Sequence, residues 1–287
     1  MRVLLTGGTG QIGAAIARAL LTAGHDVIAL LRDANRPGLL TGLPLRWAQG
    51  DITRPDTLGA AASGAEAVIH TAGLVSYAAQ DAARLHAVNV EGTRNVLNAA
   101  AAAGARRVVL TSSIAALGEV KADELGDEDT LWGWGGLGLY YLESKFEAEQ
   151  LALGDTRLEV IALNPGIVFG ADDLSGHTSA LFSQVLGGAT PTFLELYAAI
   201  AASLGVPAPR RVVGEGLLYS FSIVEGWLAR LGQRRPRITP ALARMSSRNR
   251  RYRCDKAVSE LGYTPRSLEE SLAETLTWMR AQGLLKV

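Results

Sequence analysis

The sequence predicts an α/β fold, in which a doubly wound parallel sheet is followed by a smaller, mainly helical C-terminal lobe. Over residues 1–170, short runs rich in Val, Ile and Leu alternate with longer helical patterns, as in parallel sheets with crossover helices. A glycine-rich turn joins the first of these runs to the first helical pattern. Beyond residue 170 the alternation stops and helical patterns dominate.

The predicted strands are short and apolar, as strands buried on both faces of a parallel sheet are. In chain order they are residues 2–6, 26–31, 45–49, 65–70, 106–113 and 158–164. Helices are expected at residues 10–23 and 80–103, and from the Leu139–Lys145 stretch to about Leu153. In the C-terminal part, two capping boxes predict helix starts: Thr192 with Glu195, and Ser267 with Glu270.

Composition limits the classes of function. With 48% hydrophobic residues among 287, the chain can bury a substantial core. Lys and Arg balance Asp and Glu at 28 each, so no net charge attracts nucleic acid or an anionic membrane, and the expected partner is a small molecule. The single Cys254 permits no internal disulfide, and every apolar run is shorter than the roughly 18 residues that span a bilayer. We expect a cytoplasmic protein. Four histidines without clustered acids give no metal-site pattern.

The first chemical motif is TGGTGQIG, residues 6–13, where the first predicted strand meets the first helix. In such a turn Gly7 permits the tight bend, Gly10 lets backbone amides approach a pyrophosphate, and Gly13 permits close packing of helix on strand. The remaining candidate cofactor contacts in the turn are Thr9, Gln11 and Ile12. The motif predicts a Rossmann-type dinucleotide-binding domain over residues 1–170, with residues 171–287 as a substrate lobe that is not independent. A glycine turn without a ligand is the alternative.

The residues after the second predicted strand bear on the type of cofactor. An acidic residue there binds the ribose 2′-hydroxyl of NAD, whereas an arginine accommodates the 2′-phosphate of NADP. Arg32 comes first after Leu31, and a guanidinium holds phosphate through charge-assisted bonds. NADP(H) is therefore preferred, and NAD(H), with Asp33 at the ribose, is the alternative.

Seven short motifs occur in order along the chain: TGxxGxxG at 6–13, GDI at 50–52, IHTAG at 69–73, NVEGT at 89–93, TSS at 111–113, YLESK at 141–145 and NPG at 164–166. Together they resemble the extended short-chain dehydrogenases/reductases, the NAD-dependent epimerase/dehydratase superfamily. Within it the chain is most similar to the dihydroflavonol-reductase-like and 3β-hydroxysteroid-dehydrogenase-like branch. The resemblance covers the first 170 residues and returns in the C-terminal DKAVSELGYTPRSLEESLAETLTWMR.

The resemblance implies a catalytic set of a tyrosine, a lysine and a serine. Tyr141 and Lys145 are four residues apart, a spacing that brings both side chains to one face of a helix. The tyrosine is expected to exchange a proton with the substrate oxygen, while the lysine ammonium lowers the tyrosine pKa and holds the nicotinamide ribose. Ser113, counted back from Gly118, is expected to orient the carbonyl. Ser112 is expected to meet local backbone groups or the cofactor, and the reverse assignment of the two serines stays open.

Further positions match family residues that border the cofactor. They are Asp51 and Ile52 beside the adenine, Thr71, Ala72 and Gly73 at the end of the fourth strand, and Pro165 and Val168 beside the nicotinamide. Members of the family often dimerise through two helices that correspond to residues 80–103 and 139–153. The resemblance therefore also implies a homodimer.

The residues after Ser113 narrow the reaction. Sugar-nucleotide dehydratases of the superfamily carry an acidic pair there, whereas this chain has the apolar run 114–116, so elimination of water is not expected. The preferred function is NADP(H)-dependent hydride transfer to or from a carbonyl/alcohol pair of a small organic substrate, of ketone/aldehyde reductase type. The alternatives are an NAD-retaining sugar-nucleotide epimerase and a catalytically silent NADP(H)-binding regulator.

Some other residues carry separate predictions. His70 is expected to be a hydrogen-bonded core histidine, and Asn89 either to place a water or to hold the backbone. The two tryptophans of TLWGWGGLGL either anchor that loop or close over a substrate. The arginine-rich residues 230–256 are expected to form a solvated helical surface balanced by acids at 119–129.

After Leu186 the chain departs from the family pattern. Relatives return to the sheet through a strand, a helix and a further strand, whereas here Leu186 is followed directly by GGATPTFLELYAAI. A strand-helix-strand unit of at least about 30 residues is therefore expected to be absent, and part of the substrate pocket with it.

Overall fold

The computed structural model describes residues 1–121, 124–166, 168–172, 193–204, 207, 214–234, 236, 238–246 and 248–284. The predicted capping box at Thr192 and the predicted deletion after Leu186 lie outside these residues.

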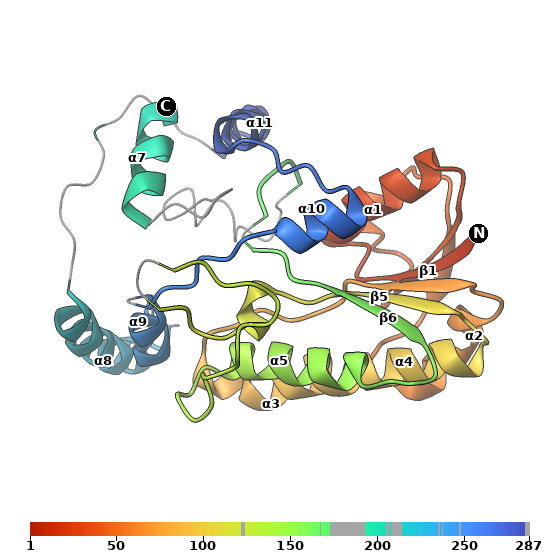
Figure 1. Ribbon diagram of the computed structural model, residues 1–287, viewed down its shortest axis with the longest axis horizontal. Coiled ribbons are helices and arrows are strands. Elements are labelled where there is room, and N and C mark those ends of the chain that lie inside the picture. Colours follow the sequence, from red (N-terminus) through yellow and green to blue (C-terminus); the bar gives the residue numbers. More distant parts are fainter. Residues whose placement is uncertain are drawn as a thin grey trace.

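A six-stranded parallel sheet forms the centre of the protein, in the order β3-β2-β1-β4-β5-β6 (Figure 1). Its strands are β1 (Arg2–Thr6), β2 (Asp26–Leu31), β3 (Arg46–Gln49), β4 (Ala67–His70), β5 (Arg107–Thr111) and β6 (Glu159–Leu163). Each strand pairs in parallel with its neighbours, so all six end at the same edge of the sheet. The predicted doubly wound parallel fold is confirmed, and every predicted strand is present with its bounds shifted by two residues or fewer.

Helices cover both faces of this sheet. Those of the N-terminal part are α1 (Gln11–Thr22), α2 (Leu58–Ala62), α3 (Ala82–Leu85), α4 (Gly92–Ala102) and α5 (Tyr140–Leu153). Short turns of 3-10 helix lie at η1 (Gly38–Leu40), η2 (Pro55–Thr57), η3 (Ala79–Asp81) and η5 (Ile114–Ala116). One core cluster packs Leu5 and Leu31 of the sheet against Ala14 and Ala17 of α1. A second covers the opposite face with α2, α4 and α5, and α4 and α5 lie side by side there (Figure 1). The apolar runs of β1 and β2 are buried because helices cover both sides of them.

The Ala-rich helix predicted at 80–103 is not one continuous α-helix. A π-helical segment, η4 (His86–Glu91), separates α3 from α4. Within it, the Asn89 carbonyl accepts a hydrogen bond from Thr93 Oγ1 at 2.6 Å. A side-chain hydroxyl that bonds the carbonyl four residues back bends or widens a helix, and such bulges often lie at functional sites.

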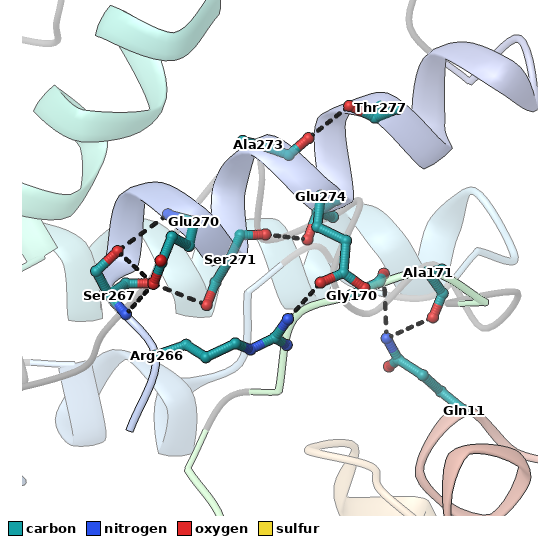
Figure 2. A network of polar contacts seen from close by, with 11 residues as sticks. Gln11, Gly170, Ala171, Arg266, Ser267, Glu270, Ser271, Ala273, Glu274 and Thr277 are labelled. Carbon is teal, nitrogen blue, oxygen red and sulfur yellow. Dashed lines mark hydrogen bonds and ion pairs between the residues drawn. The ribbon is translucent and has the colours of Figure 1, made fainter. Parts of the chain in front are cut away.

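The described part of residues 171–287 contains helices and no strand that joins the sheet. They are α7 (Phe193–Leu204), α8 (Glu215–Leu231), α9 (Pro240–Ser246), α10 (Asp255–Leu261) and α11 (Leu268–Ala281). The predicted capping box that begins α11 is confirmed. Ser267 Oγ accepts from the Glu270 amide at 3.2 Å, and the Glu270 carboxylate accepts from the Ser267 amide at 2.9 Å (Figure 2). None of the helices in the described residues has the length and apolar character needed to cross a membrane.

Gly13→Ala is expected to destabilise the fold. A Cβ at this position would lie 2.2 Å from the Gly7 carbonyl oxygen, which belongs to the backbone of the preceding turn and cannot rotate away. Overpacking of this kind costs about 1–3 kcal/mol of unfolding free energy, which urea denaturation measures. Gly59→Ala is the matched control, because Gly59 lies in α2 with open space where its Cβ would be, and alanine is favoured there by about 1 kcal/mol. An unchanged stability of Gly13→Ala contradicts the close packing of α1 on the turn.

Candidate active site

The strand order reverses between β1 and β4, which lie side by side with Thr6 paired to His70 at their ends. In open α/β sheets, ligands bind at such a reversal, beyond the carboxyl ends of the strands. The glycine motif follows β1, residues 71–73 follow β4, and Ser112 and Ser113 follow β5. The parallel register therefore brings these predicted site residues to one edge of the sheet.

In the glycine turn, Gly7 and Gly13 are packed too closely against backbone to be replaced without movement. Gly7 has a φ of +72°, and a Cβ there would lie 2.5 Å from the Ala72 amide nitrogen. The first helical residue of α1 follows Gly10, which provides no side-chain cap, so the first amides of the helix are open to an anion. Around them, Thr9 and Gly10 are exposed, and Ile12 is half-buried. This turn fits the pyrophosphate of a dinucleotide.

Gln11 turns its side chain away from the centre of this turn. Its Nε2 donates to the carbonyl oxygens of Gly170 and Ala171, at 3.3 and 3.1 Å (Figure 2). An ion pair of 2.9 Å between Arg18 and Asp172 adds a second link from α1 to the same segment. The Gln11 side chain therefore joins the glycine turn to the start of the C-terminal lobe, and its backbone amide remains the candidate for a cofactor contact.

Tyr141, Lys145 and Ser113 lie together beyond β5. Tyr141 and Lys145 share the buried face of α5, and each is 9% exposed. Ser113 lies close enough to the Tyr141 side chain to lower its pKa, and its Oγ accepts from the Ala115 amide at 3.1 Å. Ser112 is buried, and its Oγ has no hydrogen-bond partner within the described residues. The structure thus brings Ser113, and not Ser112, to the tyrosine.

Burial, and after it the nearby Tyr77, raise the pKa of Tyr141 to about 12. The hydrogen bond from Ser113 and the positive charge of Arg250 act in the opposite direction. Lys145 is not among the groups that shift the pKa of Tyr141, which differs from the expected lowering, and its ammonium donates to the Thr111 carbonyl oxygen at 2.9 Å. A phenol with a raised pKa stays protonated at neutral pH, as a proton donor must, but it is a weaker acid than an ordinary tyrosine.

Lys145 is itself strongly affected by its surroundings. Burial lowers the pKa of its ammonium to about 8, and the charge of Glu149 partly opposes this. Glu149 is 6% exposed, and its carboxylate accepts from Asn164 Nδ2 at 2.6 Å. The same Asn164 nitrogen donates to the Ser113 carbonyl oxygen at 3.2 Å, so Glu149 and Asn164 join α5 to the serine loop. Glu149 was not among the predicted site residues, although its position four residues after Lys145 places it on the same face of the helix.

His70 and Asn89 are both structural. His70 is 1% exposed, with Nδ1 at 2.6 Å from Thr6 Oγ1 and Nε2 at 3.1 Å from Thr93 Oγ1, and burial lowers the pKa of its imidazole to about 3. The predicted hydrogen-bonded core histidine is confirmed. Asn89 accepts from the Leu74 amide at 2.7 Å and donates to the Leu74 carbonyl oxygen at 3.0 Å, so it holds the loop after β4.

Arg32 and Asp33, the two residues considered for binding the ribose, differ in the partners of their side chains. Within the described residues, the exposed Arg32 side chain makes neither a hydrogen bond nor an ion pair. The Asp33 carboxylate accepts from the Asn35 amide at 2.9 Å and lies 3.5 Å from the guanidinium of Arg36. Asp33 is therefore engaged in its own turn, while Arg32 is available.

The other predicted cofactor positions are distributed around the same edge. Thr71 Oγ1 donates to the Thr6 carbonyl oxygen at 2.6 Å, the Ala72 amide donates to Thr6 Oγ1 at 3.3 Å, and Gly73 is exposed. The Asp51 carboxylate accepts from Thr53, whereas the Ile52 side chain lies in the core at 7% exposure. The Pro165 carbonyl oxygen accepts from the Ile114 amide at 3.0 Å, and Val168 is 37% exposed. Ile52 therefore has only its backbone to offer a ligand.

The tryptophan loop is anchored. Trp134 is fully buried, and its Nε1 donates to the Leu117 carbonyl oxygen at 2.9 Å. Trp132 stacks on Phe146 of α5 with ring centroids 4.4 Å apart and planes inclined by 8°. Both tryptophans are therefore packed against neighbouring residues, which supports the anchoring alternative for this loop.

The arginine-rich region is correctly predicted in its charge balance and only in part in its conformation, since Pro240–Ser246 is helical and 248–253 is not. Arg248 pairs with Glu119, and Arg253 pairs with Asp127, so acids at 119–129 do balance it. Residues 248–253 are extended rather than helical, because their backbone bonds to the loop after η5. Among the described residues, no three His, Cys, Asp or Glu side chains are grouped to hold a metal ion.

Residues 3–195 match the profile of the NAD dependent epimerase/dehydratase family. The chain belongs to this family. It is 31% identical over 330 aligned positions to "Putative dihydroflavonol 4-reductase" of Synechocystis, covering 98% of this chain and 95% of that protein. The aligned span exceeds the 287 residues of this family member, so it includes positions at which only the relative has a residue.

Two further comparisons agree with this membership. A 3 beta-hydroxysteroid dehydrogenase/Delta 5-->4-isomerase of Mycobacterium tuberculosis is 36% identical over 197 residues, covering 65% of this chain and 52% of that protein. The solved structure of gox2253 superposes with a TM-score of 0.80 at 28% identity and covers 99% of both chains. The predicted resemblance to the dihydroflavonol-reductase-like and 3β-hydroxysteroid-dehydrogenase-like branch is confirmed.

The buried Lys145 predicts a rise in the stability of this family member in mildly alkaline solution. Because the pKa of Lys145 is about 8 in the fold and 10.5 ordinarily, the unfolded chain binds more protons than the folded chain between these pH values. The contribution of Lys145 to the unfolding free energy therefore increases over this window, by up to about 3 kcal/mol. Urea denaturation from pH 7 to 10 should show this increase in the wild type and not in Lys145→Met. Lys121→Met, which removes an exposed lysine, should keep it. The same pH slope in Lys145→Met and wild type contradicts a desolvated ammonium.

Proposed function

We propose that the protein is an NADP(H)-dependent oxidoreductase that transfers hydride between nicotinamide and the carbonyl/alcohol group of a small organic substrate. The observation that carries the proposal is the grouping of Ser113, Tyr141 and Lys145 beside the glycine turn at one edge of the sheet. A reductase and a dehydrogenase among the relatives support the same class of reaction.

Each part of the cofactor can be assigned to residues of the site whose chemistry fits it. The open amides at the start of α1 would bind the pyrophosphate, and Arg32, which has no side-chain partner among the described residues, would bind a ribose 2′-phosphate. Thr71, Ala72, Gly73, Asp51, Pro165 and Val168 remain proposed contacts along the edge. When bound, the reduced nicotinamide supplies the hydride that the carbonyl carbon accepts. NAD(H) is the alternative if Asp33 leaves its turn.

The chain's own residues supply the proton and the orientation. Tyr141 donates its phenolic proton to the carbonyl oxygen as negative charge develops there, and its raised pKa keeps that proton in place beforehand. Ser113 is within hydrogen-bond reach of Tyr141, so its hydroxyl orients the same oxygen. Lys145, fixed by the Thr111 carbonyl on the face of α5 that carries Tyr141, is proposed to hold the nicotinamide ribose.

Three features bear on the alternative functions, which are elimination of water, sugar-nucleotide epimerisation and silent NADP(H) binding. The residues after Ser113 are Ile114, Ala115 and Ala116, and none carries an acid for the elimination of water. A sugar-nucleotide epimerase would retain its NAD, so NAD released on denaturation of the purified protein would favour that function. The aligned span of 330 positions supports the proposal that this chain lacks a segment of its relatives, and with a reduced pocket a silent NADP(H)-binding regulator is the other candidate.

The oligomeric state and the cellular location of the protein are also proposals. α4 and α5 lie side by side on one face of the sheet, and we propose that they form a homodimer contact. The balanced charge and single cysteine support a cytoplasmic protein.

Tyr141→Phe is expected to abolish reduction of a panel of ketones and aldehydes while leaving NADPH binding intact, because it removes only the donated proton. Tyr140→Phe is the matched control, since the neighbouring Tyr140 is 39% exposed and points away from the buried face. Steady-state kinetics and fluorescence titration with NADPH measure the two properties. Turnover by Tyr141→Phe at the wild-type rate rules out the mechanism. Intact NADPH binding without turnover in the wild type favours the silent regulator.

Arg32→Ala is expected to weaken NADPH binding by roughly 10- to 100-fold, because charge-assisted hydrogen bonds to the 2′-phosphate are lost. NADH binding should change little, since NADH lacks that phosphate. Arg54→Ala removes an exposed arginine that pairs with Asp56, and it controls for the loss of one positive charge. If Arg32→Ala weakens NADPH and NADH equally, Arg32 does not select the cofactor.

A further inference from the structure

Residues 248–253 cross from α9 to α10 along the loop that follows Ser113. The Val120 amide donates to the Asn249 carbonyl oxygen at 3.1 Å, and the Gly126 amide donates to the Arg251 carbonyl oxygen at 2.8 Å. Asn249 Nδ2 adds bonds to the carbonyl oxygens of Lys121 and Glu124, at 2.7 and 3.0 Å. The backbone on both sides of Arg250 is therefore held in place by the loop of the catalytic serine.

The arginines of this segment have different partners. Arg248 pairs with Glu119 and lies over the ring of Trp134 at 5.7 Å, and Arg253 pairs with Asp127. Arg250 is half-buried, and within the part of the chain that the structure describes its guanidinium makes neither a hydrogen bond nor an ion pair. An arginine held by its backbone, half-buried and without an acidic partner, has its donors available for a ligand.

Arg250 lies close enough to Tyr77 and Tyr141 for its charge to act on both phenols. Its positive charge lowers the pKa of both the Tyr77 and the Tyr141 phenol, opposing the larger effect of burial. Those two rings meet edge to face with centroids 5.6 Å apart. Met245 and Leu242 of α9 belong to the same apolar cluster as Tyr141. A guanidinium, an apolar wall and the proton-donating phenol therefore border one region.

We propose that Arg250 binds the carboxylate of the substrate, so that the substrates are oxo acids whose carbonyl meets Tyr141 and Ser113. The proposal rests on the proposed oxidoreductase function and names its substrate class. A guanidinium binds a carboxylate through two parallel N–H···O bonds, a geometry that also fixes the orientation of the molecule. The carbon chain between the two ends would lie against Tyr77, Leu242 and Met245. Arg250 is thus a specificity residue for a substrate with one anionic end.

The kinetic test compares oxo acids of increasing chain length, beginning with acetoacetate and levulinate, with their methyl esters. With NADPH, the wild type should prefer the acids, and Arg250→Gln should lower kcat/KM for the best acid by roughly 10- to 100-fold, mostly through KM. The ester should be reduced equally by both proteins, and Arg250→Lys should recover part of the loss. Arg253→Gln removes a neighbouring positive charge that already pairs with Asp127, and it should leave the ratio of acid to ester unchanged. An equal loss on acid and ester overturns the proposal, because Arg250 would then act only on the fold or on Tyr141.

A binding experiment separates this proposal from the proposed function. Calorimetric titration of the protein, with NADPH present, compares octanoate with its amide, neither of which can be reduced. Octanoate should bind the wild type at least tenfold more tightly than octanamide, and Arg250→Gln should remove the difference. If the difference is found but no oxo acid is reduced, carboxylate binding stands and the reductase fails. Equal binding of octanoate by wild type and Arg250→Gln overturns the role of Arg250 whatever the activity.

Discussion

The contact between the β1–α1 turn and the end of β4 is the constraint on which the rest of the structure depends. Gly7 takes a left-handed conformation with its Cα against the Ala72 amide, and Gly13 lies against the Gly7 carbonyl. No side chain larger than hydrogen fits either position without moving backbone. Because the strands are parallel, this one contact places the start of α1 beside the ends of β4 and β5, where the serine and the tyrosine lie.

A chain of buried polar contacts extends this constraint to α5. It runs through Thr6, His70, Thr93, Asn89 and Ser144 to the carbonyl oxygen of Tyr141. Each contact in this series is a hydrogen bond between groups that would be costly to bury without a partner. The series of hydrogen bonds is therefore most stable when every one of them forms. The π-helical segment at η4 belongs to this chain, since the Asn89 carbonyl is bonded by the Thr93 hydroxyl. The irregular helix is thus part of what positions α5.

The electrostatics of the site follow from burial more than from charge. Tyr141 and Lys145 are both taken out of water, which favours the neutral phenol and lowers the pKa of the ammonium. The Lys145 ammonium donates a hydrogen bond to the Thr111 carbonyl oxygen of β5, and the positive charge that lowers the pKa of Tyr141 is that of Arg250, more than 100 residues further along the chain. Arg250 of the C-terminal lobe therefore affects the pKa of Tyr141, which belongs to the Rossmann domain.

Local patterns in the sequence determined the sheet, the first glycine turn and the capping box of α11, because apolar runs, small residues and caps act over a few neighbours. They also placed Tyr141, Lys145 and Ser113 at the ends of elements that a parallel sheet must bring together. Only the tertiary structure decided that Lys145 bonds Thr111, that the Gln11 side chain reaches Gly170, and that 248–253 is extended beside the serine loop. Each of these depends on a partner remote in the chain, and residue spacing carries no information about which distant backbone groups will need a hydrogen bond once water is excluded.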